Sequence, residues 1–364
     1  ICRQQGIRHP LIVTDQGIVG IGMLDKLCAI LDEAGTLYSC FSEVVADPPE
    51  HIVLAALEQA KHEKIDGVIG FGGGSSMDTA KLVALITRSG ENLADIYGVD
   101  QAQGQRLPLI LIPTTAGTGS EVTAVAIVTT GETTKAGVVA NQLFPDVALL
   151  DAELTLGLPS AITAATGIDA MVHAIEAYTS AHRKNPYSDM LALAALRLMS
   201  THILTATHNG KDLEARQAML YGACLAGQAF ANAPVAAVHA LAYPLGGHYH
   251  IPHGLSNSLV LPQVLRFNAG SAAPLYAEIA REIVPGIDSD CADMQAASAL
   301  ISYLENLIAE LQLPATLKDM DVPEEDLPML AADAMLQQRL LVNNPREVTE
   351  QDALAIYQAA WTGS

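Results

Sequence analysis

The strongest constraint on the fold is a change in the hydrophobic pattern near residue 155. Before this point, short β-branched runs alternate with segments of helical periodicity, which predicts a parallel sheet covered by helices on both faces. The runs expected to form strands are 10–14, 38–45, 66–71, 107–112 and 147–150. Two further runs, 125–130 and 135–140, flank Gly131-Glu132-Thr133-Thr134 and predict a hairpin added to that layer.

After residue 155 the β-branched runs largely disappear. Segments rich in Ala and Leu, such as 187–207 and 213–231, repeat at helical spacing, so we expect an all-helical second part. A chain of 364 residues is longer than one hydrophobic core usually serves. We therefore expect two domains, 1–155 and 156–364, joined near Leu156-Gly157-Leu158-Pro159.

Charge and hydropathy argue against several classes of partner. The net charge is −21 and the 19 Lys and Arg residues form no basic block, so we expect no binding to nucleic acid or to anionic membranes. No apolar run approaches the roughly 20 residues that cross a bilayer. The five scattered cysteines are typical of reduced thiols, which predicts a cytoplasmic protein. There is no signal peptide. Because the chain begins at Ile1 and has no initiator Met, we expect the natural protein to begin upstream, with one more strand.

A glycine turn between an expected strand and an expected helix predicts a phosphate site. Gly72-Gly73-Gly74-Ser75-Ser76 follows the run 66–71 and precedes a helical segment. Glycines let a backbone approach a pyrophosphate closely, and the amides and dipole at a helix start attract it. Met77 stands where G-x-G-x-x-G has its third glycine, so the alternative is a tight loop capped by Ser75 or Ser76.

Two other segments have the composition of a nucleotide site. Asp15 ends the first expected strand, where its carboxylate can accept from ribose hydroxyls and repel a 2′-phosphate, although it is equally typical of a turn. The usual dinucleotide fold places this acid after the glycine loop, so the order is reversed here. The loop 113–121 follows a strand and is dense in hydroxyls and glycine, which suits a phosphate, a carboxamide or a simple turn.

One aspartate and three histidines form a candidate metal set. Asp169 and His173 are spaced i, i+4 in a segment predicted to be helical, so they share one face. His239 and His253 bracket an apolar segment, and four of the eleven histidines fall within residues 239–253. Imidazole nitrogens with one carboxylate suit Fe(II), Zn(II) or a similar divalent ion.

Spacing alone leaves the metal set open. An isolated Asp or His is more often a hydrogen-bonded structural residue, and no interval proves that residue 169 meets residue 239. We expect the chain between His239 and His253 to turn at Pro244, Gly246 and Gly247 and so return the second histidine to the first.

Taken in order, these motifs resemble the iron-dependent alcohol dehydrogenase family over nearly the whole chain. The resemblance is carried by the Gly72–Ser75 turn with Asp78 and Lys81, the loop 114–121, the Gly167-Ile168-Asp169 helix with His173, and His239 with His253. It implies a Rossmann-like, dinucleotide-binding α/β domain followed by a helical metal-binding domain, the dehydroquinate synthase-like fold class. It also implies a cleft between the domains and a homodimer.

The resemblance also implies roles for individual residues. The metal ligands would be Asp169, His173, His239 and His253, with His239 and His253 also counted as catalytic. Cofactor contacts would come from Asp15, Gly73, Gly74, Ser75, Asp78, Thr114, Thr115, Thr118 and Lys135. Asp15 matches the acid associated with NAD rather than NADP. The expected metal is Fe2+, although the same donors would hold Zn2+.

Two positions depart from the family pattern. Tyr243 stands where members often have another histidine, so the proton relay to solvent would need Tyr243, His248 or His250. The Asn-Pro turn that follows the second strand in the family is Asp47-Pro48 here.

The donor set suggests a reaction. A divalent metal with three neutral imidazoles and one carboxylate keeps a net positive charge, which lowers the pKa of an alcohol so that hydride can pass to a nicotinamide. Few Lys or Arg residues lie near the ligands, which favours a small neutral alcohol, aldehyde or ketone. The alternatives are an enzyme like maleylacetate reductase or glycerol dehydrogenase, a metal-dependent hydrolase or lyase, and a nucleotide-binding protein without catalysis.

Overall fold

The chain forms two compact units. The structure, a computed structural model, describes residues 1–131 and 134–363. One unit comprises Ile1–Thr115 with Gly119–Thr155, and the other comprises Ala116–Thr118 with Leu156–Ser364. Apart from the short segment Ala116–Thr118, the division falls where the hydrophobic pattern changes.

The first unit is built on a five-stranded parallel sheet in the order β2-β1-β3-β5-β8. Its strands are β1 (Pro10–Asp15), β2 (Ser39–Val44), β3 (Gly67–Gly72), β5 (Leu109–Pro113) and β8 (Val147–Ala148). All five runs expected to be strands are strands, and the parallel sheet is confirmed. Because the chain leaves β1 for a strand on one side and returns for β3 on the other, the carboxyl ends of β1 and β3 flank the point where such sheets bind ligands.

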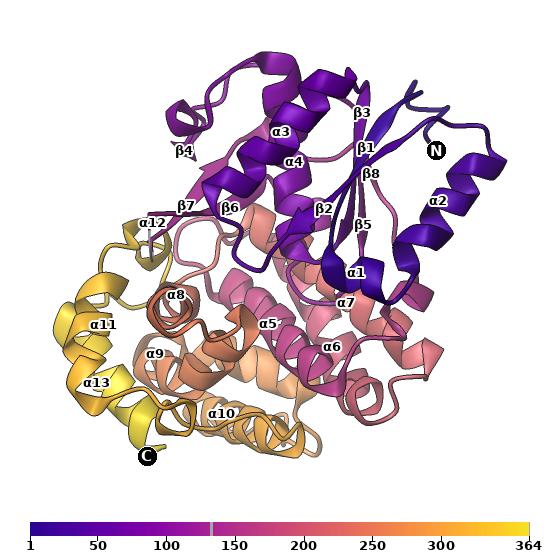
Figure 1. Cartoon of the computed structure of the whole chain (residues 1–364). Coiled ribbons are helices and arrows are strands. Elements are labelled where there is room, and N and C mark those ends of the chain that lie inside the picture. The colour runs from indigo at the N-terminus through magenta and orange to yellow at the C-terminus, as the bar shows by residue number, and fades with distance from the viewer. Residues whose placement is uncertain (132–133, 364) are drawn as a thin grey trace. The chain divides into compact units, whose positions relative to one another are not determined.

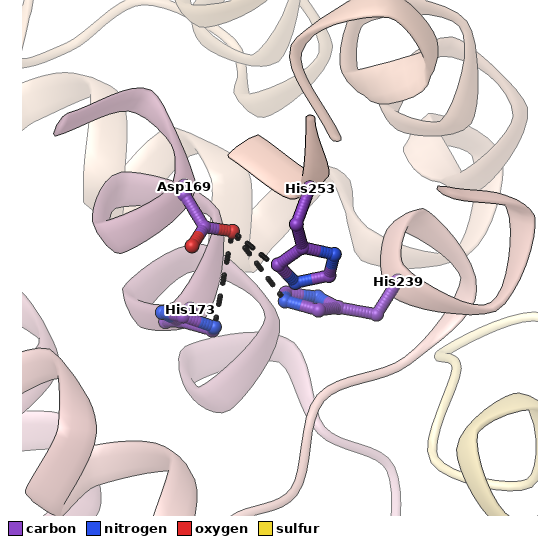
Figure 2. Close-up of side chains that lie close together, drawn as sticks. All are labelled: Asp169, His173, His239 and His253. Carbon is purple, nitrogen blue, oxygen red and sulfur yellow. Dashed lines mark ion pairs between the residues drawn. The ribbon is translucent and has the colours of Figure 1, made fainter. Parts of the chain in front are cut away.

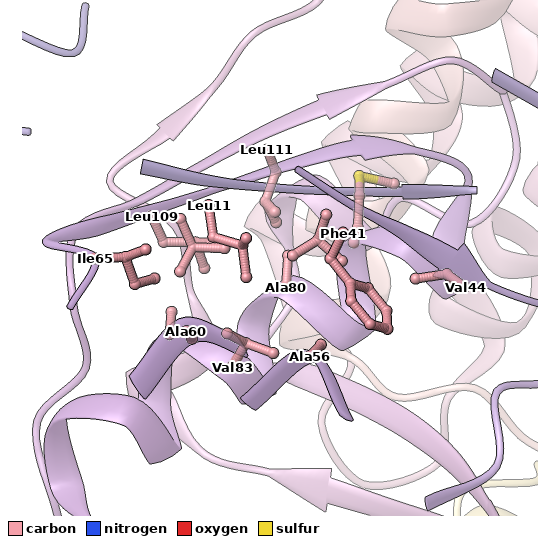
Figure 3. Packing of buried hydrophobic residues seen from close by; sticks show 14 residues of the cluster. Leu11, Phe41, Val44, Ala56, Ala60, Ile65, Ala80, Val83, Leu109 and Leu111 are labelled. Carbon is pink, nitrogen blue, oxygen red and sulfur yellow. The ribbon is translucent and has the colours of Figure 1, made fainter. Parts of the chain in front are cut away.

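Helices cover both faces of this sheet (Figure 1). They are α1 (Gln16–Gly20) and α2 (Met23–Glu33), which follow β1, and α3 (Glu50–Glu63) and α4 (Gly74–Ser89), which follow β2 and β3. Successive strand residues alternate between the faces. Leu11 packs with Val83 of α4 in the cluster of Figure 3, whereas its neighbour Ile12 packs with Leu31 of α2. Both faces of the sheet are therefore buried.

The predicted hairpin is present, but the prediction that it extends the main layer is wrong. It forms a separate sheet in the order β4-β7-β6, from β4 (Gly98–Val99), β6 (Val125–Thr130) and β7 (Thr134–Val139), with β6 and β7 antiparallel. Ala126 and Val138 belong to a buried cluster that covers another side of α3 and α4. The turn residues Glu132 and Thr133 lie outside the described residues.

Within the described residues 156–363, the second unit contains no strand, as predicted. Its helices are α5 (Ser160–Thr179), α6 (Pro186–His208), α7 (Leu213–Asn232), α8 (Ala237–Tyr249), α9 (His253–Ile283), α10 (Asp293–Glu310), α11 (Leu327–Ala334), α12 (Gln338–Leu341) and α13 (Glu350–Thr362). α5 is central, because it packs against α6, α7 and α9 and is buried over most of its length.

In the described part of the chain, one helix taken by itself, α6, is long and apolar enough to cross a membrane by length and composition. Its mean hydropathy is 1.3. α7 and α8 pass the same criterion only as a pair bent by 107°. α6 packs against α5 and α7. Core helices of soluble proteins also meet this criterion, so it is weak evidence for a membrane span.

The predicted turn at Pro244, Gly246 and Gly247 is wrong, because α8 continues through all three residues. Proline in a helix interior costs about 3 kcal/mol. Burial of the α8 side chains offsets this cost, and the Tyr357 hydroxyl donates to the carbonyl of Leu241 (2.6 Å). The chain reverses later, at residue 250, where the backbone is left-handed with φ 54°.

Candidate functional site

Four side chains from three helices of the second unit converge on one point (Figure 2). Asp169 and His173 lie on α5, His239 lies on α8, and His253 is the first residue of α9. One ligand atom from each lies within 4.8 Å of the others. Oδ1 of Asp169 is 4.0, 3.8 and 3.7 Å from Nε2 of His173, His239 and His253. The structure thus brings together the two pairs that spacing alone could not connect.

The chemistry of this quartet fits a divalent cation. It offers three imidazole nitrogens and one carboxylate oxygen, a donor set suited to Fe(II) or Zn(II). Metal bonds to these atoms measure about 2.0–2.2 Å, so the donors, which lie within 4.8 Å of one another, would draw slightly closer together around one ion.

Protonation also favours coordination. Burial lowers the pKa of His173 to about 3, although Asp169 opposes the change. Burial alone would raise the pKa of Asp169, but the neighbouring histidines outweigh it and the pKa lies below its usual value. At neutral pH His173 is therefore neutral and Asp169 is ionised, the states that a metal requires.

Glu176, which the sequence reasoning missed, orients His239. Its Oε2 accepts from the Ala236 amide (2.9 Å) and its Oε1 from the Val238 amide (2.7 Å), and Nδ1 of His239 lies 2.7 Å from Oε2. A carboxylate at Nδ1 fixes the ring tautomer and leaves Nε2 to face the other ligands. The signal was the spacing, because Glu176 follows Asp169 by two helical turns and shares its face.

Asn257 is a second missed residue. It is buried one turn after His253 on α9, and its Nδ2 lies 2.5 Å from Oδ1 of Asp169. The same nitrogen is 3.3 and 3.5 Å from Nε2 of His239 and His253. Its Oδ1 is buried without a hydrogen-bond partner among the described residues. Asn257 therefore holds the carboxylate of Asp169 from inside the quartet.

A glycine permits the close crossing of α5 and α9 that brings the ligands together. A Cβ at Gly254 would lie 2.4 Å from the carbonyl oxygen of Ala165 and 3.2 Å from Cβ of Asp169. Any side chain at this position would push the start of α9 away from α5, and His253 would move with it.

The three proton-relay candidates lie in different surroundings. The ring of Tyr243 lies 5.9 Å from that of His253. Nε2 of His248 lies 2.6 Å from Oδ2 of Asp333 on α11, and His250 is an exposed residue at the end of α8. Of the three, Tyr243 is the one whose ring lies beside the ring of a proposed metal ligand, His253.

In the first unit, the glycine turn leads directly into α4. Gly73 is the N-cap residue, and no side chain among the described residues caps the helix, contrary to the alternative with Ser75 or Ser76. Gly72 has φ 155°, and a Cβ there would lie 2.7 Å from Oγ of Ser76. The amides at the start of α4, including those of Gly74 and Ser75, therefore form a site suited to an anion.

Asp15 has structural contacts at this edge of the sheet. Its Oδ1 caps α1 by accepting from the amides of Gly17 (2.9 Å) and Ile18 (3.1 Å). Its Oδ2 accepts from the Ser76 hydroxyl (3.2 Å). The carboxylate thus joins the end of β1 to the first turn of α4, at the point where the strand order reverses.

The other cofactor candidates lie in three places. Thr114 donates its amide to the carbonyl of Gly72 (3.0 Å), and a Cβ at Gly73 would lie 3.7 Å from the Thr115 side chain, so both threonines border the glycine turn. Thr118 belongs to the short segment grouped with the helical unit. Lys135 lies on β7 of the hairpin.

Asp78 faces the loop and the hairpin. It accepts from the Ser120 hydroxyl (2.6 Å), the Ile127 amide (2.9 Å) and the buried Lys81 ammonium (3.4 Å). Burial raises the pKa of the nearby Glu121 to about 7, which Lys81 opposes. Asp78 therefore fastens β6 and the end of loop 113–121 to α4.

Family models match both parts of the chain. The model described as iron-containing alcohol dehydrogenase matches residues 1–152, and the model of the C-terminal part of the Fe-containing alcohol dehydrogenase family matches residues 163–361. The chain belongs to the iron-containing alcohol dehydrogenase family. This membership confirms the predicted fold class, an α/β domain followed by a helical domain.

Relatives within the iron-containing alcohol dehydrogenase family are similar over almost their full length. Long-chain-alcohol dehydrogenase 1 of Geobacillus thermodenitrificans is 42% identical, over 100% of this chain and 92% of the relative. NAD-dependent methanol dehydrogenase of Bacillus methanolicus is 36% identical, over 98% and 93%. The crystal structure of a 1,3-propanediol oxidoreductase, 35% identical, superposes with a TM-score of 0.95 over 99% of this chain and 94% of that one.

As a member of the iron-containing alcohol dehydrogenases, the chain is a metal-dependent oxidoreductase that interconverts an alcohol and its aldehyde or ketone with a nicotinamide cofactor. Family membership therefore decides against a hydrolase, a lyase and a non-catalytic nucleotide-binding protein.

Proposed function

We propose that the chain oxidises a small neutral alcohol, or reduces the corresponding aldehyde or ketone, with NAD and one Fe2+ ion. The metal would be held by Asp169, His173, His239 and His253. The observation that supports this most strongly is the convergence of one carboxylate and three imidazoles. Both ions suit these donors, so the choice of Fe2+ over Zn2+ rests on the family.

When bound, the metal supplies Lewis acidity toward the oxygen of the alcohol. The residues of the chain supply orientation and charge. Asp169 contributes the one negative charge of the ligand set, Glu176 holds Nε2 of His239 toward the centre, and Asn257 holds Asp169. Because its ring lies beside that of His253, the hydroxyl of Tyr243 would carry a proton between the site and solvent.

We propose that residues 1–155 form the dinucleotide-binding domain and residues 156–364 the metal-binding domain. Gly73, Gly74, Ser75, Thr114, Thr115 and Thr118 would contact the cofactor, with Asp78 and Lys135 beside them. The open amides at the start of α4 support a pyrophosphate site. The carboxylate of Asp15 would favour NAD, because it repels the 2′-phosphate of NADP.

A small neutral substrate is supported by the scarcity of Lys and Arg near the four ligands. Three relatives are named after uncharged alcohols, namely long-chain alcohols, methanol and 1,3-propanediol, whereas another, 37% identical, is named after sulfoacetaldehyde, which carries a negative charge. We further propose a homodimer in the cytoplasm, on the grounds of the family, the negative net charge and the cysteines, none of which is in a disulfide.

The test is the rate of NAD reduction with a panel of short alcohols and diols. Protein is stripped of metal and reloaded anaerobically with Fe(II) or Zn(II). We expect NADH formation only after reloading, and we expect His253→Ala to lose metal and turnover together. His208→Ala, which removes an exposed histidine of α6, is the matched control. Full activity of the wild type without metal would refute the proposal.

A further inference from the structure

The turn that follows β2 is fastened to the hairpin by one threonine. The Thr129 hydroxyl of β6 donates to the carbonyl of Asp47 (2.9 Å), and the Thr129 amide donates to the carbonyl of Pro48 (3.0 Å). Pro49 forms an isolated bridge with the same residue. Asp47 itself has φ 49°, a left-handed conformation that aspartate tolerates better than most residues. These contacts with Thr129 therefore hold the backbone of Asp47 in place.

In this position Asp47 meets Lys135. Lys135 pairs with Thr129 across the β6–β7 ladder, and its Nζ lies 2.6 Å from Oδ1 of Asp47. The lysine side chain is 6% exposed and that of the aspartate 43%. The ammonium is thus enclosed, whereas the carboxylate that holds it is half-exposed.

This ion pair lies on the ligand-binding edge of the sheet. Val44, the last residue of β2, pairs with Asp15 at the end of β1, and Asp47 follows three residues later. On the other side, the amide of Ile127, two residues before Thr129 on β6, donates to Asp78 of α4. Asp47 and Lys135 are therefore connected through Thr129 and β6 to Asp78, in the N-terminal part of α4.

We propose that Asp47 lowers the affinity of the protein for its dinucleotide, because it shares Lys135 with the phosphates or ribose of the bound cofactor. The inference rests on the proposed function. A lysine ammonium acts as a compact point charge toward phosphate. While Asp47 neutralises that charge, less of it acts on the cofactor. A weaker hold on NADH would also speed its release after hydride transfer.

The test is a double-mutant cycle on the full chain with its metal, read out as NADH affinity by fluorescence titration. Asp47→Asn keeps the shape and removes the charge, and Lys135→Met keeps the apolar stem. We expect Asp47→Asn to lower the Kd for NADH about two- to fivefold, the range of one half-exposed ion pair. Lys135→Met should raise the Kd, and the double variant should match Lys135→Met. Glu43→Gln, which removes an exposed carboxylate from β2, should leave the Kd unchanged.

Other outcomes would contradict the proposed role of Asp47. An unchanged or higher Kd in Asp47→Asn overturns it, and an equal gain with and without Lys135 shows that Asp47 acts by charge alone. If Lys135→Met does not fold, as judged by circular dichroism, the salt dependence of Asp47→Asn replaces the cycle. In Asp47→Asn the ammonium of Lys135 is no longer neutralised, so the plot of log Kd against log salt concentration should be steeper than for the wild type. Identical slopes in the two proteins would overturn the inference. Wild-type protein that binds no NADH would instead refute the proposed function.

Discussion

The ring of His239 lies between two carboxylates, with Nδ1 2.7 Å from Oε2 of Glu176 and Nε2 3.8 Å from Oδ1 of Asp169. Both carboxylates come from α5, two helical turns apart. α5 therefore supplies both a proposed ligand, Asp169, and the carboxylate that orients another proposed ligand, His239. Since both oxygens of Glu176 also accept backbone amides at the start of α8, the same side chain fixes the helix that carries the ring.

Replacement of Glu176 should weaken metal binding. Glu176→Gln loses one oxygen acceptor, so His239 no longer has a carboxylate that fixes its tautomer. Loss of such a partner typically costs about 10- to 100-fold in metal affinity. Titration of metal-free protein with Co(II) or Zn(II) measures the change. Glu214→Gln, an exposed residue in the first turn of α7, is the control, and equal affinities in the two variants would contradict the expected role.

Asn257→Asp should make folding depend more strongly on metal. The substitution places a second carboxylate 2.5 Å from Oδ1 of Asp169, where like charges repel. A divalent cation would relieve this repulsion. We therefore expect the rise in Tm on adding Zn(II) to be larger than in the wild type, measured by thermal melting with and without metal. An equal rise in both proteins would show that Asn257 does not contact the metal set as described.

Two glycines of α9 should respond in opposite directions to alanine. At Gly254 a Cβ meets the backbone of α5, and overpacking of this kind costs about 1–3 kcal/mol. At Gly270 a Cβ meets nothing within 4 Å, so alanine should stabilise the helix by up to about 1 kcal/mol. Urea unfolding of both variants measures the difference. If Gly254→Ala were as stable as the wild type, the close crossing of α5 and α9 would not require a glycine.

Glu121 should make the protein less stable as the pH rises. Its pKa is raised by burial from 4.5 to about 7, so the folded state holds this proton more tightly than the unfolded state does. Stability is then lost between about pH 4.5 and 7, by on the order of 3 kcal/mol in total. Glu121→Gln should abolish this component, which urea unfolding at pH 5 and pH 8 measures. Glu43→Gln should keep the wild-type profile, and an unchanged profile in Glu121→Gln would contradict the shift.

Local patterns made the main sheet predictable. Runs such as 66–71 carry their strand signal in their own composition, and β3 covers Gly67–Gly72. The place of the hairpin was not predictable in this way, because it depends on the packing of Ala126 and Val138 against distant helices. The continuation of α8 through Pro244 has the same origin, since burial of the helix outweighs a local signal for a turn.

The candidate site was predictable by residue type and only partly by position. The i, i+4 spacing placed Asp169 and His173 on one face, but their meeting with His239 and His253 depends on the crossing at Gly254, which no spacing reveals. Glu176 was in principle predictable from its position two turns after Asp169. Asn257 was harder to predict, because an amide is neither a preferred ligand nor a titratable group.

The proposed ligands join α5, α8 and α9, segments that are up to 84 residues apart in the chain. An ion that binds the assembled set, and not the unfolded chain, adds its binding free energy to the stability of the helical domain. Iron supply would then govern the abundance of the enzyme as well as its activity. In cells starved of the metal, apoprotein would unfold more often and be degraded faster, and the amount of enzyme would follow the free metal concentration.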